Sequence, residues 1–296
     1  MKSLGRLLTA MVTPFDEKGE VDYEQARKLA LALIESGSDG VVVVGTTGES
    51  PTLTHEEDIS LFAAIKEAVA DRGSVVAGTG SNSTAEALMK TREAERIGVD
   101  ACLLVVPYYN KPSQEGLYQH FKTIATSTSL PCILYNIPGR TGTNLSAKTT
   151  AQLSEIDNII GTKDASGDLS HIANIIATSG EDFLVFSGND SDTLPILSIG
   201  GYGVISVASH LAGKQMKEMI NCAVEGKLMD AARMHRDLLP LFEAVMLSGN
   251  PVSIKYALNH IGFTVGNPRL PLVMPNETDS STIAQVISRY RIDLPV

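Results

Sequence analysis

The chain has 296 residues, of which 43% are hydrophobic and 20% are charged, so we expect a packed globular core. This length exceeds the usual size of one domain, but α/β barrels often reach it as a single domain. The net charge of -10 argues against broad binding to nucleic acid or to an anionic membrane. It does not argue against a local cationic pocket for an acidic substrate.

The cysteines and the N-terminus indicate a cytoplasmic protein. Cys102, Cys132 and Cys222 are odd in number and far apart, and two of them lie in apolar runs, so we expect reduced thiols. The apolar run before Pro14 is too short for a signal peptide. No apolar stretch is long enough to span a bilayer, so we expect no membrane partner.

Short apolar runs recur along the first two thirds of the sequence. They are separated by roughly 20 to 35 residues, about the length of one strand and one helix. Eight strands that alternate with helices predict either a closed (β/α)8 barrel or an open doubly wound sheet. The runs are residues 7–12, 41–44, 75–77, 102–106, 133–135, 159–162, 184–186 and 204–207.

Helical patterns fill the gaps between these runs. Residues 22–35 place their apolar side chains on one face of a helix. Thr54 with Glu57, and Ser83 with Glu86, are typical of capping boxes that open a helix. The segments between the runs are therefore predicted to be helices.

The count of eight favours the barrel, and so does the lack of a dinucleotide-binding fingerprint. Residues 78–83 follow a strand and open a helix, but the third glycine of that fingerprint is missing. We therefore predict an α/β fold, with a catalytic (β/α)8 TIM barrel over residues 1–224. From residue 225 onward strand-like runs end, and residues 225–296 are predicted to form a C-terminal helical domain.

That helical domain has three predicted segments. Residues 228–246 and residues 282–290 carry apolar side chains at helical spacing. Between them, Asn250 and Pro251 predict a helix start, with Asn250 as the cap and Pro251 in the first turn.

A single lysine ends the sixth apolar run. Lys163 would lie at the carboxyl end of its strand, which is the end where barrels of this class build their active sites. Burial disfavours an ammonium group, so it would lower the pKa of the lysine and leave a nucleophilic amine. The alternative is a structural lysine that closes the strand and extends its ammonium group to water.

Polar residues follow several other runs. Small residues at 45–50 offer backbone amides that suit a carboxylate, although they could also form only a turn and a helix cap. Tyr108, Tyr109 and Tyr135 could be ordinary packed aromatics, and Arg140 could form a surface ion pair. The histidines lack the spacing of metal ligands, so no metal site is predicted.

Together these residues fit one chemistry. A lysine of lowered pKa forms an imine with a ketone, and a tyrosine transfers protons. Backbone amides hold a carboxylate, and an arginine presents a positive charge to a second acidic substrate. We predict no cofactor.

Four motifs resemble the dihydrodipicolinate synthase family, in that family's order and spacing, and the resemblance extends over essentially the whole chain. It implies a lyase that condenses pyruvate with L-aspartate 4-semialdehyde through a lysine Schiff base. The product would be 4-hydroxy-tetrahydrodipicolinate, on the diaminopimelate route to lysine. The motifs are Gly-Thr-Thr-Gly-Glu at 45–49, Tyr-Tyr-Asn at 108–110, Tyr-Asn-Ile-Pro-Gly-Arg-Thr-Gly at 135–142 and Gly-Thr-Lys-Asp-Ala-Ser-Gly at 161–167.

The functional residues of the family carry over one by one. The resemblance makes Lys163 the Schiff-base lysine and Tyr135 the general acid and base. Thr47 would link Tyr135 to Tyr109, which in the family reaches in from a neighbouring subunit. The remaining substrate-binding positions are the amides of Thr46 and Thr47 for the pyruvate carboxylate, Arg140 for the semialdehyde carboxylate, and Gly188 and Ile205 in the pyruvate pocket.

The resemblance also implies an assembly and a regulatory site. A tyrosine that acts across an interface implies at least a dimer, and we expect a homotetramer built as a dimer of dimers. Pro51 and Asp58 depart from the lysine-sensitive pattern, and Asp58 would add negative charge near a cationic ligand, so lysine inhibition stays open. The residues that match the family's lysine site are Ser50, His55, Asn82, Glu86 and Tyr108.

Two other functions compete with this one. N-acetylneuraminate lyase and 2-keto-3-deoxygluconate aldolase belong to the same superfamily and share the lysine and the tyrosine. Arg140 in its Pro-Gly-Arg-Thr-Gly context, together with Tyr109, favours the synthase, whose second substrate carries a carboxylate. A barrel that only senses an amino acid is disfavoured, because the residues of the predicted chemistry are all present, namely Lys163, Tyr135, Thr47 and Tyr109.

Overall fold

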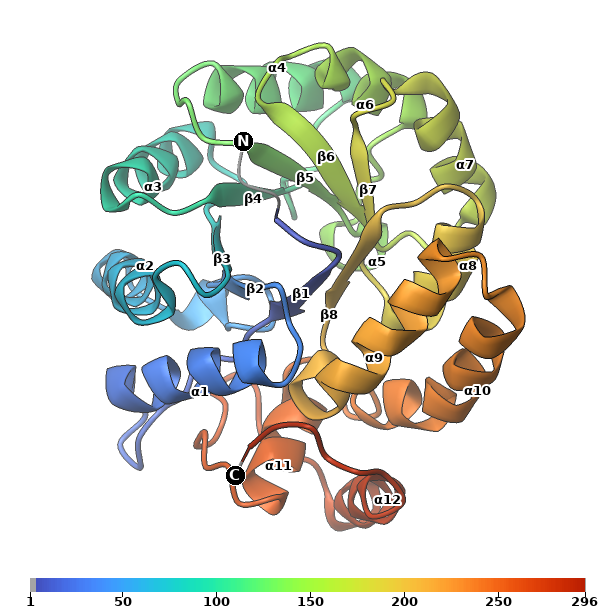
Figure 1. Ribbon diagram of the computed structural model, residues 1–296. Helices are drawn as coiled ribbons and strands as arrows, with labels where there is room; N and C mark the ends of the chain where they lie inside the picture. Colours follow the sequence, from blue (N-terminus) through green and yellow to red (C-terminus); the bar gives the residue numbers. More distant parts are fainter. Residues whose placement is uncertain (1–3, 296) are drawn as a thin grey trace.

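The computed structural model describes residues 4–295, and within them eight parallel strands form a closed barrel with helices around it (Figure 1). Neighbouring strands pair in sequence order, and the last strand pairs with the first. Each of the eight predicted runs forms a strand, so the predicted TIM barrel is confirmed. The strands are β1 (Leu7–Ala10), β2 (Gly40–Val43), β3 (Ser74–Gly78), β4 (Ala101–Val105), β5 (Cys132–Asn136), β6 (Ile159–Asp164), β7 (Leu184–Ser187) and β8 (Gly203–Ser206).

Helices connect the strands and cover the outside of the barrel (Figure 1). Two short 3-10 helices, η1 (Ser50–Thr52) and η2 (Asp190–Asp192), follow β2 and β7. The α-helices are α1 (Tyr23–Glu35), α2 (His55–Val69), α3 (Thr84–Ile97), α4 (Gln114–Ala125), α5 (Pro138–Thr141), α6 (Ala147–Ser154), α7 (Leu169–Thr178), α8 (Thr193–Ser198) and α9 (Ser209–Val224).

The two predicted capping boxes differ in outcome. Thr54 and Glu57 form a complete box at the start of α2, with both reciprocal hydrogen bonds. Ser83 caps α3 by accepting the N–H of Glu86, but the carboxylate of Glu86 does not return to Ser83. That carboxylate instead lies 3.1 Å from the ammonium of Lys90, because an ion pair one turn along the helix competes with the cap.

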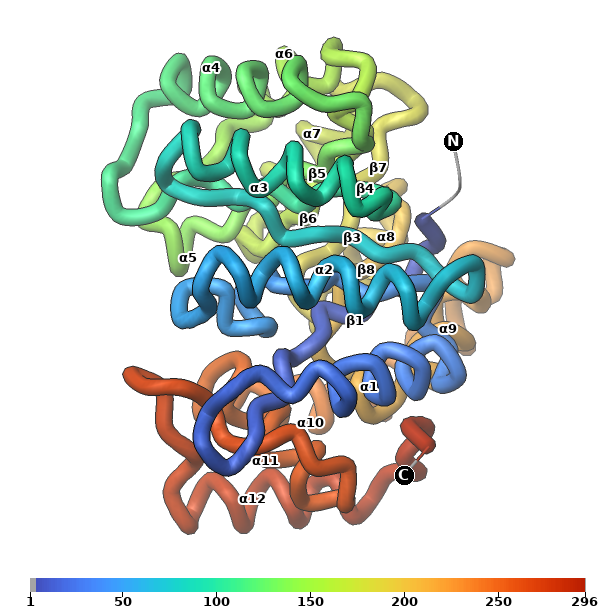
Figure 2. The backbone as a smooth tube through the Cα atoms, turned by 90° about the vertical axis from the view of Figure 1, so that its left-hand side faces the viewer, coloured from blue at the N-terminus to red at the C-terminus, as the bar shows by residue number. Residues whose placement is uncertain are grey.

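Between residues 225 and 295 the chain forms the three predicted helices, α10 (Leu228–Ala244), α11 (Val252–His260) and α12 (Glu277–Ile287). These helices lie together beside α1 and α9 (Figure 2). The predicted start of α11 is wrong by one position. Pro251 holds the cap position and Asn250 lies before the helix, where its side chain contacts Thr47 of the loop after β2.

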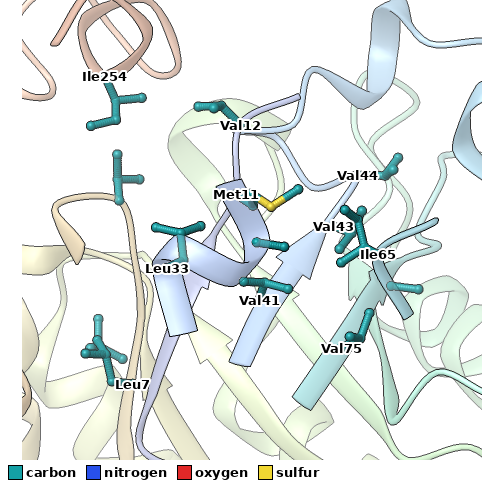
Figure 3. Packing of buried hydrophobic residues seen from close by; sticks show 14 of the residues in the cluster. Leu7, Met11, Val12, Leu33, Val41, Val43, Val44, Ile65, Val75 and Ile254 are labelled. Carbon is teal, nitrogen blue, oxygen red and sulfur yellow. The ribbon is translucent and has the colours of Figure 1, made fainter. Parts of the chain in front are cut away.

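The apolar core has an inner and an outer layer. Alternate strand residues fill the inside of the barrel, and the others pack between the strands and the helices. The outer layer continues into the C-terminal helices, since Ile254 of α11 belongs to the same cluster as Val12 and Leu33 (Figure 3). The boundary predicted between residues 224 and 225 follows the end of α9, and the division into two domains stays a prediction.

The thiols of Cys102, Cys132 and Cys222 are free, as predicted, and the first two are buried. Among residues 4–295, no helix has both the length and the apolar composition needed to cross a membrane.

Replacing Ile254 by alanine is expected to destabilise the entire chain by about 2–5 kcal/mol, because it removes fully buried methyl groups from a core that α11 shares with the barrel. Urea unfolding followed by far-UV circular dichroism should show one transition, moved to lower urea. The exposed Val273→Ala is the control and should change little. An early, separate loss of helical signal would instead mean that residues 225–296 unfold as an independent domain.

Candidate active site

Lys163 is buried at the carboxyl end of β6, with 6% of its surface exposed. Its register partners are Tyr135 on β5 and Phe186 on β7. Burial lowers the pKa of Lys163 to about 8; the carboxylate of Asp190 opposes that shift and Arg140 adds to it. The neutral, nucleophilic form of the amine is therefore far more accessible near neutral pH than in an exposed lysine. The alternative of a lysine that extends to water is wrong.

A cavity of about 370 Å³ opens at this end of the barrel. One of its walls comes from α10 and the segment after it, including Phe242, Met246 and Asn250. The C-terminal helices therefore form part of the pocket, which the sequence did not predict. Five predicted site residues line the same cavity, namely Thr47, Tyr135, Arg140, Lys163 and Gly188.

Tyr135 is the buried phenol of the site, and the ammonium of Lys163 lies 4.4 Å from the centre of its ring. Burial raises the pKa of Tyr135 to about 12, while Arg140 and a hydrogen bond with the Thr46 side chain act to lower it. The phenol is therefore protonated at neutral pH and can donate a proton. Thr46 and Tyr135 also line a separate hollow of about 30 Å³.

The hydroxyl next to Tyr135 differs from the one predicted. Thr47 was expected to contact Tyr135, but its hydroxyl accepts a hydrogen bond of 2.9 Å from the side-chain amide of Asn250. Within one chain, Thr46 provides the hydroxyl partner of Tyr135. The backbone carbonyl of Asn250 also accepts a hydrogen bond of 3.2 Å from Arg140, so Asn250 joins two predicted substrate-binding residues.

The loop after β2 is a tight turn with two available donors. The N–H of Gly48 donates to the carbonyl of Gly45 at 3.0 Å, and that of Glu49 donates to the carbonyl of Thr46 at 3.1 Å. In the described part of the chain, the N–H groups of Thr46 and Thr47 have no hydrogen-bond acceptor. Both can therefore donate to an anion such as a carboxylate.

The loop after β7 brings the carboxyl group of Asp190 to the cavity. Asp190 is 8% exposed, and its Oδ2 accepts the N–H groups of Val207 and Ala208 at 3.1 and 2.9 Å. Burial raises the pKa of Asp190. Its position directly after the seventh apolar run was visible in the sequence, although no role was assigned to it. In residues 4–295, no three His, Cys, Asp or Glu side chains are arranged to hold a metal ion.

Gly188 of the same loop lies where β6 and β7 approach closely. A Cβ atom at this position would lie 2.6 Å from the Cβ of Ala165 and 3.0 Å from the carbonyl oxygen of Asp164. Its N–H donates to that oxygen at 2.6 Å. A larger residue would push the loop away from the strand that carries Lys163.

Three of the predicted catalytic and substrate-binding residues lie outside the lining of the main cavity, namely Thr46, which lines the small hollow, Ile205 and Tyr109. Ile205 is fully buried on β8, in the inner cluster that also contains Tyr135. Tyr109 follows β4, is 89% exposed, and has a positive φ of 74°. The predicted contact between Tyr109 and Thr47 needs a second chain, so it stays a prediction.

Glu86, one of the predicted lysine-site residues, belongs to an internal ion-pair cluster. The ammonium of Lys90 lies 2.8 Å from Asp58 on α2 and 3.1 Å from Glu86 on α3. The side chain of Asp58 is fully buried and paired with Lys90, so the effect of its negative charge on a cationic ligand stays a prediction. The other predicted positions are Ser50 in η1, His55 at the start of α2, Asn82 before α3 and Tyr108 after β4.

Comparison with known proteins gives the family. The sequence model of the dihydrodipicolinate synthetase family matches residues 3–290. The chain belongs to this family. A 4-hydroxy-tetrahydrodipicolinate synthase of Dehalococcoides mccartyi is 62% identical over 296 residues, which cover 100% of both chains. The predicted family is therefore confirmed over N-acetylneuraminate lyase and 2-keto-3-deoxygluconate aldolase.

Solved structures of the family agree with this fold. Dihydrodipicolinate synthase from Bacillus anthracis has a TM-score of 0.96 and 45% identity, covering 98% of this chain and 99% of that one. The enzyme from Cyanidioschyzon merolae, solved with lysine bound, has a TM-score of 0.95 and 46% identity, covering 96% and 97%.

Replacing Lys163 by methionine is expected to stabilise the folded chain at pH 7, by at most about 3 kcal/mol, since the pKa falls from 10.5 to about 8 on folding. Below pH 8 the buried Lys163 ammonium lowers the free energy of unfolding by its full amount. This effect disappears between about pH 8 and pH 10.5, where the unfolded chain still binds the proton and the folded chain does not. Urea unfolding at pH 7 and pH 10 should therefore show a smaller gain at the higher pH.

The matched control is Lys148→Met on α6, where the lysine is exposed. It should change stability little at either pH. A Lys163→Met chain that is less stable than the native chain at pH 7 would contradict the lowered pKa.

Proposed function

We propose that this chain condenses pyruvate with L-aspartate 4-semialdehyde through a Schiff base on Lys163, as a 4-hydroxy-tetrahydrodipicolinate synthase. One observation carries the proposal. A buried lysine of lowered pKa lines the same cavity as Tyr135 and Arg140, in a chain of the dihydrodipicolinate synthetase family. The product lies on the diaminopimelate route to lysine.

Pyruvate binds first in this proposal. The N–H groups of Thr46 and Thr47 receive its carboxylate, which leaves the keto carbon to the neutral amine of Lys163. Attack forms a carbinolamine, and loss of water gives an iminium. The phenol of Tyr135 is protonated at neutral pH, so it can donate the proton that the leaving hydroxyl needs. The phenolate that remains then accepts a proton from the methyl carbon of the iminium. The resulting enamine is a carbon nucleophile.

The second substrate enters beside Arg140. The guanidinium, held by the carbonyl of Asn250, pairs with the semialdehyde carboxylate. The enamine then attacks the aldehyde carbon, which forms the new C–C bond, returns the enamine to an iminium, and leaves an alkoxide that takes a proton from Tyr135. The amine of the same substrate attacks the iminium carbon, which closes the ring and releases Lys163.

The exposure of Tyr109 supports an assembly of several chains. A large aromatic side chain that is 89% exposed, on a residue with positive φ, is costly unless a partner covers it. We propose that it reaches the Thr46–Thr47 turn of a second subunit, within a homotetramer built as a dimer of dimers. We assign the enzyme to the cytoplasm, since its free buried thiols suit a reducing compartment.

Pyruvate with sodium borohydride should add mass to Lys163, found by peptide mass spectrometry, because borohydride reduces the iminium to a stable amine. Trapping should become faster as the pH rises toward about 8, since the neutral fraction of the amine grows. Lys163→Arg should give no adduct. In a coupled assay, only pyruvate with aspartate semialdehyde should turn over. Comparable turnover of N-acetylneuraminate or 2-keto-3-deoxygluconate would contradict the proposal.

Free lysine is expected to change initial rates by less than about twofold at concentrations on the order of 1–10 mM. The ammonium of Lys90 already pairs with Glu86, the carboxylate that a lysine effector would need, and with Asp58. Lys90→Met frees both carboxylates, so this variant should become sensitive if circular dichroism shows it folded. Lys148→Met is the control. Native rates that fall steeply with lysine would show that the internal pair does not block the site.

A further inference from the structure

Glu49 and Lys255 form an ion pair directly behind the carboxylate-binding turn. The Lys255 Nζ lies 2.6 Å from Glu49 Oε1, and the two side chains are 0% and 1% exposed. The ammonium also donates to the carbonyl of Asn267 at 3.3 Å and lies 4.0 Å from the centre of the Phe15 ring. The other carboxylate oxygen accepts the backbone N–H of Arg269 at 2.8 Å. The Lys255 ammonium and the Glu49 carboxylate are therefore each fixed by more than one contact.

Stability does not explain why the chain keeps these two charges. Burial lowers the pKa of Lys255 to about 8 even though Glu49 opposes that shift. Apolar residues of similar volume often stabilise a core as well as a buried ion pair does, or better. A directed pair differs from apolar packing because it fixes where the Glu49 side chain points.

Glu49 also ends the turn that carries the two free amides. Its φ is +59°, a left-handed conformation that a non-glycine residue seldom adopts. Its N–H donates to the carbonyl of Thr46, and the hydroxyl of Thr13 donates to the carbonyl of Gly48 at 2.6 Å. The orientation of the turn thus depends on the contacts that the Glu49 carboxylate makes with Lys255 and with the N–H of Arg269.

The same C-terminal segment holds the turn at a second point. Asn250, just before α11, donates to the hydroxyl of Thr47, and Lys255 lies in the second turn of α11. One short segment therefore contacts both the middle and the end of the turn.

We propose that Glu49 and Lys255 are positioning residues for pyruvate binding, through which α11 sets the direction of the Thr46 and Thr47 amides. This inference rests on the proposed function. The carboxylate must sit on those amides while the keto carbon meets Lys163, and a misplacement of about 1 Å can cost about 100-fold in rate.

The test measures the pyruvate concentration that half-saturates borohydride trapping on Lys163, together with Tm. Lys255→Met alone leaves Glu49 buried without its partner, so the double variant Glu49→Gln/Lys255→Met removes both charges together. We expect the double variant to have nearly the native Tm but a half-saturating concentration raised about tenfold or more. The trapping rate at saturating pyruvate should also fall, because pyruvate held on displaced amides places its keto carbon farther from the Lys163 amine.

The control is Lys66→Met, which breaks a partly buried pair with Asp100 at the opposite end of the barrel. It should lower Tm without changing half-saturation. A double variant of native Tm whose half-saturation lies within about twofold of the native value overturns the inference. If the double variant does not fold, the same two quantities are measured on Lys255→Arg. A raised half-saturating pyruvate concentration supports the positioning role, whereas a lowered Tm with unchanged half-saturation overturns it. No adduct in the native chain would instead overturn the proposed function.

Discussion

The burial of the Lys163 ammonium is the constraint on which the chemistry of this barrel depends. Three buried lysines show that burial alone does not make a nucleophile. Burial lowers the pKa of both Lys163 and Lys255 to about 8, but only Lys163 faces a cavity, while Lys255 faces Glu49. Burial also acts to lower the pKa of Lys90, but Asp58 and Glu86 raise it above its usual value. The charged partners and the open space in front of the amine decide its role.

The pocket joins two parts of the chain that differ in sequence pattern. The barrel supplies the lysine, the phenol and the turn with free amides, whereas α10 supplies a wall and Asn250 binds both Thr47 and Arg140. The outer core is continuous across residue 225. The change from strands to helices at that residue is thus a change of local structure within a shared core and a shared site.

Local patterns predicted the strands and the position of Lys163, because apolar runs and strand ends are encoded by neighbouring residues. The family resemblance placed Thr47 next to Tyr135, but adjacent residues of a turn point in directions that depend on its backbone conformation, and within one chain it is Thr46 that lies there. Asn250 was missed as a site residue because its partner lies about two hundred positions earlier in the sequence. The pairing of Asp58 with Lys90, which reaches it from the next helix, was missed for the same reason.

The turn after β2 also connects catalysis with the predicted regulatory region. Ser50 begins η1 directly after Glu49, and it lines the same small hollow as Thr46 and Tyr135. A ligand that moved η1 would therefore act on the hydroxyl next to the Tyr135 phenol without entering the main cavity. The buried Glu49–Lys255 pair resists such a movement, because shifting Glu49 would separate two charges in a region that water does not reach. In the proposed function, the rigidity of this turn therefore holds the Thr46 and Thr47 amides in place for pyruvate and opposes movement of η1 by the same physical means.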